Sequence, residues 1–172
     1  MKKISMILFF ICFIVTACNS DTVDSTRYTG KSLVIGVIGE APNVKEENVD
    51  FQQITFKQLE DLSPDYDAIF IMKEHLSEAA TQKYAKVYKN AGIPFFFIES
   101  TKSYLPFINE ELSYDDAPDL SSDTYATGYY QSGKEFQYWG YGLYNEKVNE
   151  SSTADVYTRI FTTMGSLEVT MK

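Results

Sequence analysis

Five polar residues with side chains suited to catalysis or ligand binding lie at or just after the ends of apolar segments of strand length. They are three carboxylates, the only histidine of the chain and one serine: Glu40, Glu74, His75, Glu99 and Ser100. Carboxylates and an imidazole can transfer protons or hold a cationic or hydroxylated ligand. Ligands of open α/β sheets bind beyond the carboxyl ends of the strands. We therefore expect these residues to converge on one rim as a candidate ligand-binding site.

A simpler interpretation of this rim is that strand ends and loops are polar in any fold of this class. A triad of His75 with Ser100 or Ser103 has no G-x-S-x-G elbow to support it. A single histidine cannot build a histidine-rich transition-metal site. Gly36 and Gly39 lack the G-x-G-x-x-G spacing, and the chain has no phosphate-binding loop, so we interpret Gly36 as a close-packing position. We assign no catalytic residue, no metal site and no cofactor.

The elements that would position the rim read as an α/β layer. Three largely apolar segments have the length of strands: 33–39, 66–72 and 93–98. Strands that are apolar on both faces are expected at the centre of a sheet covered by helices. Between the last two strands, a helical pattern runs from Ser77, its expected N-cap, to Gly92. A weaker strand, 49–55, is expected at the periphery. Residues 33–101 are predicted to form a small Rossmann-like or flavodoxin-like layered sheet with a βαβ core.

The second half of the chain predicts an aromatic-rich β-hairpin and then a C-terminal helix over 151–164. Between residues 125 and 144, eight of 20 residues are aromatic, and two extended runs flank the turn sequence QSGK. Four of the rings form a candidate aromatic surface: Tyr129, Tyr138, Trp139 and Tyr141. Such rings can stack on sugars or pack against a partner protein. The alternative is that tyrosine simply suits a half-buried strand.

The N-terminus has the pattern of a secretory signal peptide. Lys2 and Lys3 precede an apolar run, 4–15, which is too short to cross a bilayer as a helix. The tetrapeptide Val15-Thr16-Ala17-Cys18 resembles the lipobox of bacterial lipoproteins. This resemblance implies cleavage before Cys18 and attachment of a diacylglyceryl group, with acyl chains such as palmitate, to its thiol. The implied location is the extracytoplasmic face of the cell membrane.

On this interpretation the chain divides into three parts. Residues 1–17 are the lipoprotein signal peptide, 18–32 are the lipidated N-terminus and a flexible tether, and 33–172 are a single α/β domain. Loss of Lys2 and Lys3 leaves 13 basic against 24 acidic residues, a net charge of −11. Such a surface repels nucleic acid, so we expect no nucleic-acid partner. Cys12 leaves with the signal peptide and Cys18 carries lipid, which removes thiol chemistry from the mature domain.

The function predicted from these features is a membrane-anchored binding or accessory module. Its expected partners are the membrane, through the lipid on Cys18, and a protein or small-molecule ligand. One alternative is a small hydrolase or transferase that acts on envelope material with the strand-end carboxylates and His75. Another is a solute-binding lipoprotein that feeds a transporter.

Overall fold

A computed structural model describes residues 23, 25–121 and 123–167 of the chain. The expected signal peptide and lipobox lie outside these residues. Among the described residues, no helix combines the length and the apolar character that a membrane span requires.

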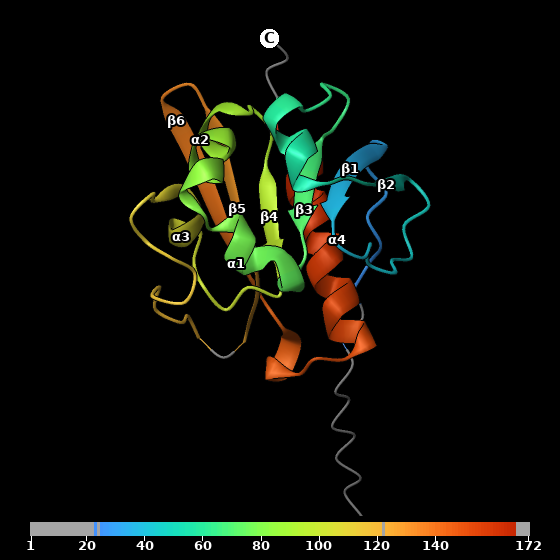
Figure 1. Cartoon of the computed structure of the whole chain (residues 1–172). Helices are drawn as coiled ribbons and strands as arrows, with labels where there is room; N and C mark the ends of the chain where they lie inside the picture. Colours follow the sequence, from blue (N-terminus) through green and yellow to red (C-terminus); the bar gives the residue numbers. More distant parts are fainter. Residues whose placement is uncertain (1–22, 24, 122, 168–172) are drawn as a thin grey trace, which may run out of the picture.

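A six-stranded mixed sheet organises the molecule (Figure 1). Its strands are β1 (Leu33–Ile38), β2 (Val49–Gln53), β3 (Ala68–Ile71), β4 (Phe95–Ile98), β5 (Thr124–Ser132) and β6 (Glu135–Gly142). Their spatial order is β2-β1-β3-β4-β5-β6. The first four strands pair in parallel, and β5 and β6 are antiparallel additions. The α/β class is thus confirmed, and the weaker second strand is peripheral, as predicted.

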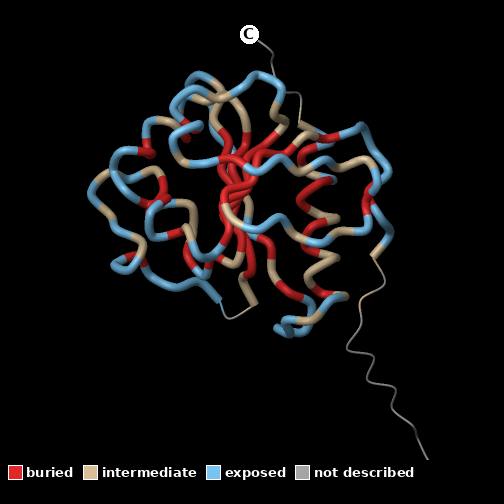
Figure 2. The backbone as a smooth tube through the Cα atoms, turned by 45° about the vertical axis from the view of Figure 1, so that its right-hand side comes forward, coloured by how far each residue is buried: buried red, intermediate tan, exposed pale blue. Residues whose placement is uncertain are grey.

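The central strands are buried because helices cover both faces of the sheet (Figure 2). One face packs against α1 (Leu76–Ala79), α2 (Gln82–Asn90), α3 (Leu105–Ile108) and the 3₁₀ turn η1 (Phe56–Asp61). The other face packs against α4 (Glu150–Ser166). Alternate residues of one strand serve the two cores: in β3, Ile69 packs toward α2 and Phe70 toward α4.

The helix expected from Ser77 to Gly92 is interrupted. His75 occupies the N-cap of α1, so the assignment of the cap to Ser77 is wrong. Thr81 is extended, with φ −75° and ψ 145°, and α2 begins after it. Thr81 uses its hydroxyl to donate to the Glu78 carbonyl at 2.8 Å, a local bond that competes with helix continuation.

Packing of the chain begins before residue 33. Tyr28 is buried in the core beneath α4, and its ring lies 6.2 Å from that of Phe161. Ser151 Oγ, at the start of α4, both accepts from the Val23 N–H and donates to the Val23 carbonyl. Every residue of the two buried clusters lies between residues 28 and 164. The chain after Cys18 therefore contains the whole described core.

The predicted hairpin and C-terminal helix are confirmed. Ser132 pairs with Glu135, which leaves Gly133 and Lys134 as a two-residue turn. Gly133 has φ +60°, the left-handed value that the first central position of a type II′ turn requires. Asn149 caps α4 by accepting from the Ser152 N–H at 2.9 Å.

Candidate functional site

The strand-end rim forms two separate contacts. The 3₁₀ turn η2 (Lys73–His75) follows β3 and carries Glu74 beside His75, with Glu74 Oε1 3.8 Å from His75 Nε2. Lys73, from the same turn, reaches across to β4, where its Nζ lies 3.4 Å from Glu99 Oε2. Glu74 also lies against Gly39, because a Cβ at that glycine would meet its carboxylate. The structure thus places three of the five predicted residues, together with Lys73, at one end of the parallel strands: Glu74, His75 and Glu99.

Two of the predicted rim residues stand apart from these contacts. Ser100 is fully buried, and its hydroxyl accepts from the Lys102 N–H and donates to the Lys102 carbonyl, both at 3.1 Å. This serine closes a turn and does not line the rim. Glu40 is exposed, and no ion pair or hydrogen bond of its side chain occurs among the described residues.

Glu99 has the most unusual backbone of the rim. Its φ of +56° lies in the left-handed region, which costs an L-residue roughly 1–2 kcal/mol. Burial raises the pKa of the Tyr125 phenol, and the Glu99 carboxylate nearby raises it further. Burial also raises the pKa of Tyr157, with contributions from Tyr125 and Glu99. At neutral pH the Tyr125 and Tyr157 phenols are therefore protonated, and they lie near the half-exposed carboxylate of Glu99.

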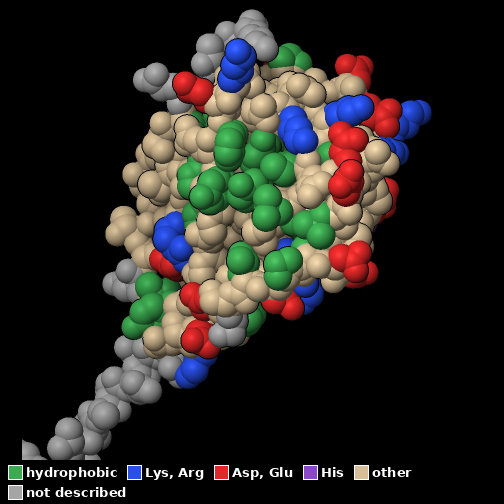
Figure 3. All heavy atoms as spheres, turned by 90° about the vertical axis from the view of Figure 1, so that its left-hand side faces the viewer, with side chains coloured by type: hydrophobic (Ala, Val, Ile, Leu, Met, Phe, Trp, Pro, Cys, Tyr) green, Lys and Arg blue, Asp and Glu red, His purple; other side chains and the backbone are tan. Residues whose placement is uncertain are grey.

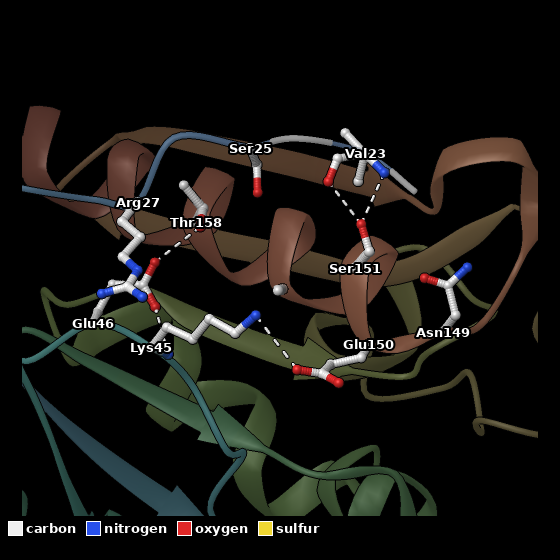
Figure 4. A pocket seen from close by; sticks show the side chains of 10 residues that line it. Val23, Ser25, Arg27, Lys45, Glu46, Asn149, Glu150, Ser151 and Thr158 are labelled. Atoms are coloured by element: carbon white, nitrogen blue, oxygen red, sulfur yellow. Dashed lines mark hydrogen bonds and ion pairs between the residues drawn. The ribbon is translucent and has the colours of Figure 1, made fainter. Parts of the chain in front are cut away.

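A hollow of about 660 Å³ lies away from this rim, where the N-terminal segment crosses α4 (Figure 4). Its wall includes Arg27, Lys45, Glu46, Glu150 and Ser151. Lys45 Nζ and Glu150 Oε1 form an ion pair at 3.4 Å between two exposed side chains. Glu46 is buried, and its carboxylate accepts from the Tyr28 N–H in the N-terminal segment and from Thr158 Oγ1 in α4. This wall therefore fastens the N-terminal segment to α4.

The structure separates the four rings of the predicted aromatic surface onto two faces. Trp139 and Tyr141 point toward α4, where Trp139 stacks on Phe96 and the Tyr141 hydroxyl donates to Thr163 Oγ1 at 2.9 Å. Tyr129 and Tyr138 are cross-strand partners on the opposite face. Because successive strand residues alternate between faces, Tyr138 and Trp139 cannot share a surface.

A different set of rings forms a continuous aromatic group: Tyr104, Tyr129, Phe136 and Tyr138, hereafter the aromatic surface. Tyr104 stacks on Tyr138, with ring centroids 4.7 Å apart, and on Tyr129 at 5.4 Å. Phe136 lies 6.1 Å from Tyr129 and 6.4 Å from Tyr138. Tyr138 is 60% exposed and Phe136 is 53% exposed. Figure 3, which looks onto the side of the molecule that carries β6 and α3, shows hydrophobic side chains gathered over this region.

Sequence reasoning missed Phe136 and Tyr104 as members of this surface. Strict alternation along β6 would have placed Phe136 with Tyr138. Tyr104 comes from the segment before α3, and no local pattern indicates that it meets the hairpin.

Among the described residues, no group of three histidine, cysteine, aspartate or glutamate side chains is placed to hold a metal ion. Comparisons with protein-family models, curated proteins and solved structures gave no match to this chain.

Proposed function

We propose that this chain is a lipoprotein anchored to the extracytoplasmic face of the cell membrane through Cys18, and that it works as a binding or accessory module. The aromatic surface carries the binding part of this proposal. The lipobox-like tetrapeptide supports the anchoring part. Two acyl chains suffice to hold a protein stably on a bilayer.

Exposure of the aromatic surface supports a binding role. Tyr138 and Phe136 keep more than half of their area in water although neighbouring rings are available to cover them. Stacking on their neighbours restricts these side chains before any ligand arrives, which lowers the entropy lost on binding. The surface combines phenol hydroxyls, which can form hydrogen bonds, with flat apolar ring faces, which can stack. A sugar ring has both hydroxyl groups and an apolar face, so it fits this combination.

The anchoring proposal is tested by lipid labelling in a bacterial host fed with alkyne-labelled palmitate. The full chain should incorporate the label and fractionate with membranes. Cys18→Ala should lose both properties, whereas Cys12→Ala, the matched control, should keep them. Labelling of Cys18→Ala, or an unlabelled full chain, would disprove the anchor.

The binding proposal is tested with the lipid-free chain 19–172, which retains the whole described core. Soluble wall oligosaccharides should shift the NMR signals of Tyr138 and Phe136 and raise the melting temperature. Tyr138→Ala should abolish both effects. Tyr144→Ala removes an exposed tyrosine, 43% accessible, outside the surface and should leave both unchanged. Signal shifts confined to other regions would reject the aromatic surface as the site.

A second candidate function rests on the left-handed backbone of Glu99. Strained residues occur preferentially at functional sites. We also propose that the parallel half is Rossmann-like or flavodoxin-like. The strand order β2-β1-β3-β4 supports this, because the chain adds β2 on one side of β1 and the later strands on the other, which makes a topological switch point between β1 and β3. In that fold, the rim with Lys73, Glu74 and Glu99 would bind or transform a small polar ligand. Glu99→Gln should then abolish binding of such a ligand, while the free energy of unfolding falls by no more than the roughly 1 kcal/mol of the exposed ion pair with Lys73.

A further inference from the structure

Strand β6 is an edge of the sheet that lacks the usual protection against pairing. From residue 136 to 142 it contains no charged residue and no proline. Edge strands of monomeric proteins commonly carry such residues, which discourage the addition of another strand. The bulge in this hairpin lies on β5, between Thr124 and Ala126, so β6 itself is regular.

The direction of the backbone groups of β6 follows from its hydrogen bonds. Leu143 donates its N–H to the Asp123 carbonyl on the side of β5, at 2.7 Å. Since backbone groups alternate in direction along a strand, the N–H and C=O groups of Phe136, Tyr138 and Gly140 point outward. The Gly142 carbonyl points the same way, and Arg159 Nη2 caps it at 2.6 Å. The part of the edge left for pairing therefore runs from Phe136 to Gly140.

We propose that a second copy of this chain pairs with this edge, antiparallel and with a two-fold axis at Tyr138, so that two aromatic surfaces become one. In this register Tyr138 faces its own symmetry mate. Phe136 faces Gly140 of the other copy, and the outward backbone groups of all three residues gain partners. The register also fills a space, because a Cβ placed on Gly140 would meet no atom within 4 Å. The ring of Phe136 from the second copy covers that open position.

Charges at the two ends of β6 are complementary in the same register. Lys134, at the hairpin tip, falls opposite Gly142, where the Asp123 carboxylate lies at the position of the missing Cβ. Glu135 falls opposite Tyr141, whose ring lies 5.9 Å from the Arg159 guanidinium carbon. Lys134 shares its face of the sheet with Gly142, and Glu135 shares the other face with Tyr141. Opposite charges therefore meet between Lys134 and Asp123, and the two-fold axis repeats this contact. On the other face Glu135 approaches Arg159, which is also paired with Asp155 at 2.8 Å.

The symmetry also agrees with a common membrane anchor. A two-fold axis perpendicular to the joined sheet leaves both α4 helices on one side. The N-terminal segment is fastened to α4 through Val23 and Ser151, so both segments leave on that side. The joined aromatic surface lies on the opposite side. The pairing goes beyond the proposed function, because a lipid-free, ligand-free chain should still dimerise.

The experiment measures the mass of the lipid-free chain 19–172 by light scattering and sedimentation over a wide concentration range. We expect a dimer whose dissociation constant rises about tenfold in Lys134→Glu and in Asp123→Lys, since each change affects two symmetry-related contacts. The double variant exchanges the charges and should restore the dimer. A structural role of either residue alone would not give this rescue.

Two further measurements fix the register. Tyr138→Cys supplies the only thiol of this chain, at the axis, where opposite Cβ atoms lie roughly 4.5–5.5 Å apart. A short thiol cross-linker should join two copies, whereas Gln52→Cys on the opposite edge strand β2 should not react in this way. In the unaltered chain, hydrogen exchange at the amides of Phe136, Tyr138 and Gly140 should slow as concentration rises. A monomer at every concentration, or a dimer without this protection, would overturn the proposal even if a variant failed to fold.

Discussion

Glu46 Oε1 accepts a hydrogen bond from Thr158 Oγ1 at 2.9 Å, although the two residues are 112 positions apart in the sequence. The same carboxylate accepts from the Tyr28 N–H at 3.4 Å and from the Lys45 N–H at 3.1 Å. Glu46 is 9% exposed and joins three segments: the chain before β1, the loop before β2, and α4. One acidic side chain thus holds the start of the packed chain in place.

Removing this carboxylate should loosen the N-terminal segment. Glu46→Ala leaves a buried backbone N–H and a hydroxyl without their acceptor, and we expect a loss of about 1–3 kcal/mol in the free energy of unfolding, measured with urea. Hydrogen exchange at the Tyr28 amide should also accelerate. The neighbouring Glu47 is exposed, so Glu47→Ala is the control and should change little. Equal stability of the two variants would contradict the role of Glu46.

The sequence was sufficient for the parallel core and insufficient for the surfaces. Runs such as 93–98 are apolar enough that burial on both faces is the only favourable arrangement, and β4 is buried as predicted. Glu46 lies in a charged stretch that predicts solvent exposure, yet α4 supplies its partner from the far end of the chain. The periodicity of a local sequence indicates whether it forms a helix or a strand. It does not indicate which distant segment will pack against that element.

The same distinction explains the rim and the aromatic surface. The rule that ligands bind beyond strand ends correctly predicted that Glu74, His75 and Glu99 lie at one end of the sheet. It could not show that the turn after β4 would bury Ser100, because that turn depends on side-chain bonds to its own backbone. The alternation of side chains along a strand could have predicted that Trp139 and Tyr138 lie on opposite faces. No sequence pattern could have predicted that Tyr104, from outside the hairpin, stacks on Tyr138.

Glu99 should tolerate glycine better than a branched residue. Its φ of +56° is favourable for glycine and strongly unfavourable for valine. The ion pair with Lys73 is exposed at both side chains and contributes at most about 1 kcal/mol. Glycine does not carry the roughly 1–2 kcal/mol cost of a left-handed L-residue. We therefore expect Glu99→Gly to have a higher free energy of unfolding than Glu99→Val in a urea titration, with Glu99→Val below the unaltered protein. The reverse order would show that the backbone is not left-handed here.

Gly36 should accept a side chain only if the isoleucines around it shift. A Cβ at this position would lie 2.7 Å from Ile69 Cδ1 and 2.9 Å from Ile54 Cδ1, which confirms the predicted close packing. We expect Gly36→Ala to lower the free energy of unfolding by about 1–3 kcal/mol, as overpacking in a core does. Gly140→Ala is the matched control in the same sheet when both variants are measured at concentrations too low for pairing, because in a single copy its Cβ would enter open space. A destabilisation of both variants by the same amount would indicate a backbone effect instead.

Alkaline pH should unfold the protein through its buried tyrosines. Burial raises the pKa of Tyr141 to about 12, although the bond to Thr163 and the charge of Arg159 partly oppose the shift. Burial also raises the pKa of Tyr157. An unfolded tyrosine ionises near pH 10, so above that pH the unfolded chain releases protons that the folded chain retains. The stabilisation from a raised pKa is complete below about pH 10 and is lost as pH rises toward about 12.

Urea titrations between pH 9 and pH 12 test this dependence. The free energy of unfolding should fall with rising pH, by up to roughly 3 kcal/mol for Tyr141 alone. Tyr141→Phe should reduce the slope, because phenylalanine does not ionise. Near neutral pH that variant loses only the bond to Thr163, worth about 1 kcal/mol. If Tyr141→Phe kept the slope of the unaltered protein above pH 10, ionisation of Tyr141 would not be coupled to unfolding.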